Sequence, residues 1–216
     1  MSEIKARARV QSMGEEIANA ISHGMGFLAA AAATPWLIMS AMRTGSTSYV
    51  VGVGIFAVTM MLMYMTSTLY HSLPGSRAKK ILRILDHNAI FLLIAGTYTP
   101  IALGVLSGFW GWTLFGLVWG LATAGIILKS FSGHKYHHIS MIIYVAMGWL
   151  VVIAAKPLFE AMPFAGIMWL LAGGLCYTGG IVFYRMKNVP YMHFVWHLFV
   201  VAGTVCHFVA ISRYGF

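Results

Sequence analysis

The chain has 216 residues, of which 60% are hydrophobic and only 9% are charged. Soluble domains contain about 25% charged residues, so this composition excludes a soluble domain and indicates an integral membrane protein. The formal net charge of +9 at pH 7 does not indicate a nucleic-acid partner, because the basic residues form short clusters between apolar runs, as in proteins oriented in a bilayer. Cys176 and Cys206 both fall within apolar runs, which indicates small buried residues and not a disulfide framework.

Seven apolar runs are long enough to cross a bilayer, which takes about 20 mostly apolar residues per helix. The first run continues too far for a cleavable signal peptide, so we expect it to remain in the mature protein. Backbone polar groups at membrane depth must be satisfied within helices, and the loops are short. The sequence therefore predicts an all-α integral membrane bundle, with an N-terminal segment at residues 1–19 and a seven-helix transmembrane domain at 20–216. The predicted spans are 20–42, 49–71, 84–106, 109–129, 138–156, 164–184 and 190–212.

Basic residues are divided unequally between the two sides of this bundle. If the N-terminus is cytoplasmic, only three of the fourteen Lys and Arg residues, Arg43, Lys156 and Arg213, fall on the outer side. Under the positive-inside rule this predicts a multi-pass protein of the cell inner (plasma) membrane, with its N-terminus cytoplasmic and its C-terminus outside. The other eleven are Lys5, Arg7, Arg9, Arg77, Lys79, Lys80, Arg83, Lys129, Lys135, Arg185 and Lys187.

Two histidines four residues apart, His193 and His197, open the last predicted span. Residues i and i+4 share a helix face, so both rings can reach one point that could hold a metal ion. Zinc prefers four ligands, and a catalytic zinc takes three from protein and keeps one position for water. His71 ends the second predicted span and Asp86 begins the third, which places both at the cytoplasmic end where the seventh span starts. Four candidate ligands are thus predicted at one depth.

Asp86 is the only acid that the predicted spans contain. An ionisable residue within a membrane helix is usually functional and is paired or faces a cavity. The alternative is a salt bridge to Arg83 or Lys80 near the lipid head groups. Ser67 precedes His71 by four residues and shares its face one turn deeper. Its hydroxyl could donate to Asp86, orient a water molecule or stabilise an oxyanion, or it could bond its own i−4 carbonyl.

The remaining histidines are weaker candidates for ligands of this metal site. His207 lies ten residues beyond the histidine pair, roughly 15 Å farther across the membrane at about 1.5 Å per residue, so we place it outside the site. His134, His137 and His138 are predicted to be solvated residues of a cytoplasmic loop. His23, at the cytoplasmic end of the first span, could reach the surroundings of the site or could simply end the span.

Several motifs follow one another along the chain: Glu16, Asn19 and His23, then Ser67 and His71, then Asp86, Gly96-Thr97-Tyr98-Thr99-Pro100, Met147-Gly148-Trp149, and the pair His193 and His197. In this order, the motifs resemble the hemolysin III branch of the progestin and adiponectin receptor family, which is grouped with alkaline ceramidases among predicted membrane hydrolases. The resemblance covers nearly the whole chain. It implies a seven-helix bundle with a zinc ion near the cytoplasmic leaflet, bound by His71, His193 and His197, with Asp86 contacting the zinc-bound water and Ser67 nearby.

Three functions fit these residues. The first is a zinc-dependent hydrolase of lipid amide or ester bonds, in which Asp86 accepts a proton from water and Ser67 helps to stabilise the oxyanion. The second is a non-enzymatic, receptor-like regulator of membrane state with a structural zinc that Asp86 also binds. The third is a pore-forming haemolysin, although a pore needs a polar path across the whole bilayer and the polar residues gather at one end.

Membrane lipids are the predicted partners, one of them a lipid substrate if the protein is an enzyme. Three histidines and a carboxylate would also accept iron, cobalt or manganese. The sequence leaves the substrate open, and it leaves open whether the chain forms a homo-oligomer.

Overall fold

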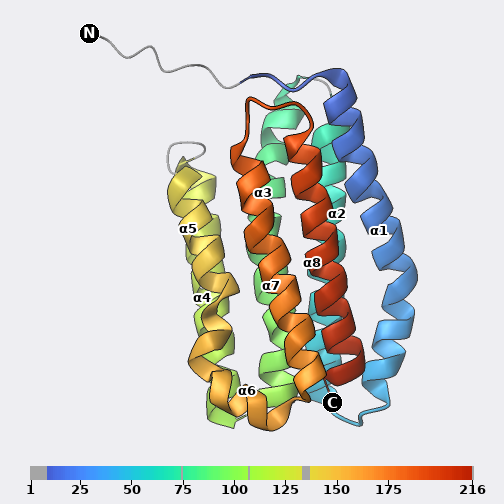
Figure 1. The fold of residues 1–216 in the computed structure, drawn as a ribbon, viewed down its shortest axis with the longest axis vertical. Coiled ribbons are helices and arrows are strands. Elements are labelled where there is room, and N and C mark those ends of the chain that lie inside the picture. Colours follow the sequence, from blue (N-terminus) through green and yellow to red (C-terminus); the bar gives the residue numbers. More distant parts are fainter. Residues whose placement is uncertain (1–8, 74, 107, 133–136, 216) are drawn as a thin grey trace.

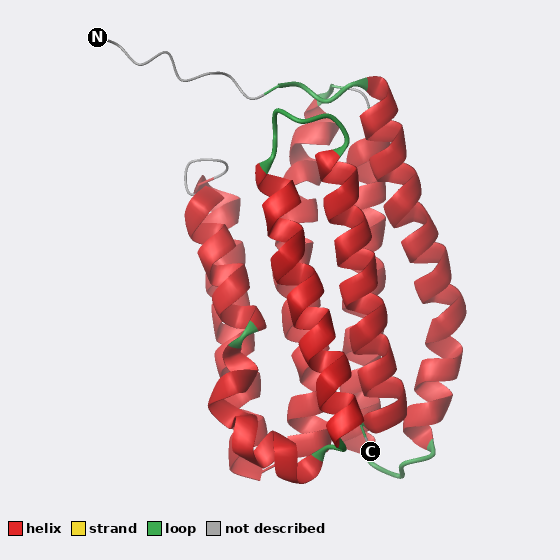
Figure 2. Cartoon of the chain, in the orientation of Figure 1, coloured by secondary structure: helices red, strands yellow, loops and turns green. Residues whose placement is uncertain are grey.

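The structure, a computed structural model, describes residues 9–73, 75–106, 108–132 and 137–215. Seven helical segments within these ranges are long and apolar enough to cross a membrane, which confirms the predicted number of spans. They stand side by side in one bundle (Figure 1), and Figure 2 shows helices and loops but no strand in the described part of the chain. The all-α fold is confirmed, and the chain is a multi-pass protein of the cell membrane.

Six spans consist mainly of one α-helix, whereas the fifth is divided. The π-helical segment η1 (Ile101–Leu106) continues the third span, and the 3₁₀ segment η2 (Leu150–Ala154) divides the fifth. The α-helices are α1 (Met13–Met42), α2 (Thr47–Ser72), α3 (Arg77–Pro100), α4 (Gly108–Ser132), α5 (His137–Gly148), α6 (Ala155–Ala161), α7 (Phe164–Arg185) and α8 (Met192–Tyr214).

Serine caps set the starts of the first three helices. The side chains of Ser12, Ser46 and Ser76 each accept a hydrogen bond from the backbone N–H three residues later, which satisfies a donor that the helix itself leaves unpaired. As a result, α1 and α3 begin at residues 13 and 77, and not at 20 and 84 as the apolar runs predicted. A capped helix can extend through a polar first turn, which hydrophobicity does not detect.

The earlier start of α1 corrects one prediction about the acids. Glu15 and Glu16 lie in the first turn of this helix, so Asp86 is not the only acid within the membrane-crossing helices. Of the basic residues behind the predicted orientation, Lys5, Arg7 and Lys135 lie outside the described residues. The orientation of the bundle remains a prediction.

The break in the fifth span is held by Tyr98 of α3. Its hydroxyl donates to the carbonyl of Gly148 and accepts from the backbone N–H of Val151, both at 2.9 Å. These bonds satisfy backbone groups where the α-helical pattern is interrupted. In α3 itself the helix ends at Pro100, which has no N–H to donate.

The way the helices pack leaves a cavity between α3 and the helices α5, α7 and α8. Helix α1 packs between α2 and α8, α3 contacts α2, α4 and α5, and α7 packs mainly on α8. The outer surface is apolar, as a lipid-facing surface should be: Leu28 and Met25 are each 67% exposed and Val182 is 60% exposed. Between α3, α5, α7 and α8 lies an apolar cavity, and it leads to the end of the bundle where the polar side chains gather.

Candidate metal centre

Three histidines from two helices meet at one end of the bundle. His71 lies in the last turn of α2, and His193 and His197 lie in the first two turns of α8. Each offers one ring nitrogen, and these three nitrogens lie within 4.8 Å of one another. The structure thus brings together the three residues that the sequence predicted as metal ligands.

Hydrogen bonds orient two of these rings. The Nδ1 of His71 lies 2.7 Å from the carboxylate of Glu16, and the Nδ1 of His197 lies 3.2 Å from the carbonyl of Asn19 and 3.0 Å from the hydroxyl of Ser22. A neutral histidine that donates from Nδ1 presents a lone pair at Nε2. Both Nε2 atoms are buried and have no hydrogen-bond partner among the described residues. Histidines that bind metals are oriented in this way, so the residues present fit a divalent metal such as zinc.

Asp86 lies beside the three histidines. It is only 8% exposed and does not belong to the group of three, but it lines the same cavity as His71 and His193. The ion pair recorded for it among the described residues is with His87, whose Nδ1 is 3.5 Å away, and not with Arg83 or Lys80. The salt bridge to Arg83 or Lys80 that the sequence left open is therefore not formed among the described residues.

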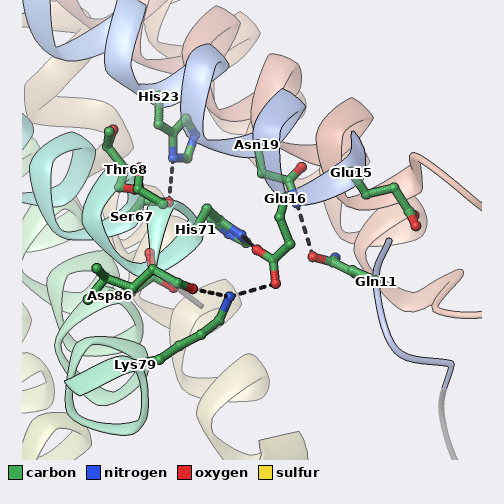
Figure 3. Close-up of polar contacts among 12 residues, drawn as sticks. Gln11, Glu15, Glu16, Asn19, His23, Ser67, Thr68, His71, Lys79 and Asp86 are labelled. Atoms are coloured by element: carbon green, nitrogen blue, oxygen red, sulfur yellow. Dashed lines mark hydrogen bonds and ion pairs between the residues drawn. The ribbon is translucent and has the colours of Figure 1, made fainter. Parts of the chain in front are cut away.

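His23 connects α1 to the same site. It is completely buried, and its Nδ1 lies 2.8 Å from the Ser67 hydroxyl (Figure 3). Its ring also stacks on that of His197, with the centroids 3.6 Å apart. The sequence left open whether His23 reaches the site, and the structure places it in contact with both a candidate ligand and a candidate catalytic residue.

The two acids of α1 hold neighbouring elements in place. Glu16 bridges His71 and Lys79, each at 2.7 Å (Figure 3). Glu15 pairs with Arg9 and accepts the backbone N–H of Tyr191 at 2.9 Å. Tyr191 precedes α8 and has φ = 62°, a left-handed conformation that is uncommon outside glycine. Glu15 therefore fastens the start of α8, where the histidine pair begins.

Sequence reasoning named Glu16 only through the resemblance and missed Glu15. The signal was present: Ser12 and Glu15 are spaced as a capping box, in which each side chain bonds the other residue's backbone N–H. That pattern marks a helix start upstream of the apolar run.

His207 and His138 lie apart from the three. His207 lines a separate cavity toward the opposite end of the bundle, as its distance along α8 predicted. His137 and His138 were predicted to be loop residues, but α5 begins at His137 and includes both; His138 does not belong to the group of three. His134 lies outside the described residues.

A family model described as "Haemolysin-III related" matches residues 11–208, which include every predicted site residue. The chain belongs to the haemolysin III family. It is 45% identical over 200 residues to the Hemolysin-3 homolog of Bacillus subtilis (strain 168), covering 93% of this chain and 94% of that relative. Hemolysin-3 of Bacillus cereus is 43% identical over 210 residues, 97% of this chain and 96% of its own. The human monocyte to macrophage differentiation factor is 28% identical over 178 residues, 78% of this chain and 70% of its own.

Two cavities adjoin the candidate site in this haemolysin III protein. A polar cavity of about 280 Å³, which we call the vestibule, is lined by His71, His193 and Asp86 together with basic side chains at the end of the bundle. An apolar cavity of about 110 Å³, which we call the groove, runs from Asp86 between α3, α5, α7 and α8. Asp86, Tyr184 and Trp196 line both spaces, so the vestibule and the groove adjoin one another.

Proposed function

We propose that this haemolysin III protein is a zinc-dependent hydrolase of lipid amide or ester bonds, with its site in the cytoplasmic leaflet. The observation that carries the proposal is the convergence of His71, His193 and His197 beside Asp86, where a polar vestibule meets an apolar groove. A buried nitrogen without a partner is costly, and a metal ion would satisfy those of His71 and His197. When bound, zinc supplies a Lewis acid that polarises a carbonyl and lowers the pKa of water to about 7.

The protein's own residues supply the proton transfers. Asp86 is the general base: its carboxylate accepts a proton from the attacking water as the carbonyl carbon becomes tetrahedral. Ser67 is the candidate donor to the oxygen that gains negative charge, and His23 lies within hydrogen-bonding distance of its hydroxyl. Asp86 then returns the proton to the leaving amine or alcohol, so the products are a fatty acid and a neutral leaving group.

The groove supports a substrate with an acyl chain. It is lined by side chains such as Ile94, Val145 and Ile181, whose surface favours hydrocarbon over water. A chain lying there would bring its carbonyl to Asp86, where the groove joins the vestibule. The cytoplasmic location is supported by the unequal division of basic residues, eleven of fourteen on the side of the site.

The vestibule also separates this proposal from its alternatives. A purely structural zinc has a closed four-ligand shell and needs no cavity for a further molecule. A pore needs a polar path through the bilayer, whereas the groove beyond Asp86 is apolar. Both features favour the hydrolase.

The test is zinc analysis of the purified protein together with a cleavage screen of lipid amides and esters. Ala at His71, His193 or His197 should remove most of the zinc and the release of fatty acid, because two imidazoles make a poor zinc site. The matched control is His138→Ala, which removes a histidine outside the group of three. Full zinc content in all three variants would disprove the metal assignment. A zinc-loaded wild type that cleaves no lipid in the screen would favour the structural zinc.

A further inference from the structure

Two cations in the vestibule have no acid partner among the described residues. Arg83 of α3 and Lys187, which follows α7, both line this cavity together with His71 and Asp86. Neither takes part in an ion pair within the part of the chain that the structure describes. The recorded contact of the Lys187 ammonium is with the ring of Tyr184, 5.9 Å from its centroid. Their positive charges are therefore available to a ligand.

The acids at this end of the bundle are already engaged. Glu15 pairs with Arg9, and Glu16 is bound by Lys79 and His71. Asp86 lines the vestibule with His71 and His193, where a divalent cation would offset its charge. The net charge of the vestibule beside Arg83 and Lys187 is therefore positive.

We propose that Arg83 and Lys187 bind the phosphate of an anionic phospholipid whose acyl chain lies in the groove. The guanidinium group of Arg presents paired donors that match phosphate oxygens, and basic pockets between membrane helices are known to hold lipid head groups. Tyr184 and Trp196 stand where the vestibule meets the groove, and such aromatic side chains favour the boundary between head groups and hydrocarbon. A cationic mouth above an apolar groove complements an amphiphile with a negative head.

This inference rests on the proposed function where it names the phospholipid as the substrate, whereas the binding itself can be measured separately. Zinc-loaded protein would be equilibrated in mixed micelles with phosphatidylglycerol and diacylglycerol of identical acyl chains. The lipid retained per protein and the fatty acid released would both be measured. The test variant is Arg83→Gln with Lys187→Gln. The control is Lys80→Gln with Arg185→Gln, which removes the same charge from exposed residues at the same end of the bundle that do not line the vestibule.

Wild type and control should both bind more phosphatidylglycerol than diacylglycerol. In the test variant, the ratio of the two affinities should be about tenfold smaller. Equal losses in the test and control variants would show diffuse surface attraction and overturn the proposal. Inorganic phosphate that binds without lipid, and with the same dependence on Arg83 and Lys187, would also overturn it by making the ligand a soluble anion. Selective binding without fatty-acid release would reject the hydrolase and leave the head-group site standing. Equal binding and equal cleavage of both lipids would support the hydrolase and reject the head-group site.

Discussion

The imidazole of His23 lies flat against that of His197, with ring centroids 3.6 Å apart and planes 6° apart. The same His23 ring lies within hydrogen-bonding distance of the Ser67 hydroxyl. One residue of α1 therefore contacts both a candidate metal ligand of α8 and a candidate catalytic residue of α2. These two contacts can be separated by mutation, because stacking needs only a flat ring whereas the hydrogen bond needs a ring nitrogen.

We expect His23→Phe to keep most of the zinc and to lose lipid cleavage. Phenylalanine retains a ring against His197 but cannot bond Ser67, so the hydroxyl would no longer be oriented. Changes to residues that orient a site typically cost about 10- to 100-fold in activity. The measurement is zinc per protein alongside the cleavage rate. Loss of zinc in parallel with activity would instead assign His23 to holding His197 in position.

Glu16→Gln should weaken zinc binding. The Glu16 carboxylate lies 2.7 Å from the Nδ1 of His71, and a neutral amide in its place would make the opposite nitrogen a poorer ligand. The zinc dissociation constant, measured by competition with a chelator, should rise about 10- to 100-fold. The matched control is Glu160→Gln, an exposed acid near the end of α6, which should leave affinity unchanged. Equal affinities for both variants would show that Glu16 serves only its ion pair with Lys79.

The sequence predicted the meeting of the site residues because the ends of membrane spans fix depth. His71 ends one span, Asp86 lies near the start of the next, and the pair His193 and His197 opens the last, so their shared level followed from the topology alone. Depth does not fix how each helix is rotated about its axis. The partner of each ring nitrogen, and the stacking of His23, therefore needed the packed structure.

Two features of the fold depend on interactions that hydrophobicity does not record. The start of α1 at Met13 depends on the capping box of Ser12 and Glu15, which lies outside the apolar run. The interruption of the fifth span depends on Tyr98, a residue of another helix that bonds the backbone at Gly148 and Val151. The first signal was local and could have been found in the sequence. The second is a tertiary contact, which Gly148 at the end of α5 marks only weakly in the sequence.

The orientation of the bundle can be tested with reporter fusions. We predict that a reporter at the C-terminus faces the exterior, because only three of the fourteen basic residues fall on that side. A second fusion, placed after Lys187, should give a cytoplasmic signal and serves as the internal control. Opposite signals at both points would show that the bundle has the reverse orientation, which would put the candidate metal centre in the outer leaflet.

The last prediction concerns Asp86, whose place beside the histidines suits work on a water molecule. Asn at this position keeps the size and one oxygen but cannot accept a proton at neutral pH. If Asp86 is the general base, Asp86→Asn should keep most of its zinc and lose about 10²- to 10⁴-fold in lipid cleavage, the usual contribution of such a group.

If Asp86 has a structural role, a different result is expected for the same variant. If Asp86 is the fourth ligand of a closed zinc site, Asn should lower zinc content and thermal stability together, and any activity should fall in proportion to the metal. Zinc per protein, melting temperature and fatty-acid release would therefore be measured on the same preparations of wild type and Asp86→Asn. His87→Gln is the matched control, because His87 lies 3.5 Å from the Asp86 carboxylate and its loss tests whether that neighbour alone explains the effect. Full metal with unchanged cleavage in Asp86→Asn would remove the carboxylate from the mechanism.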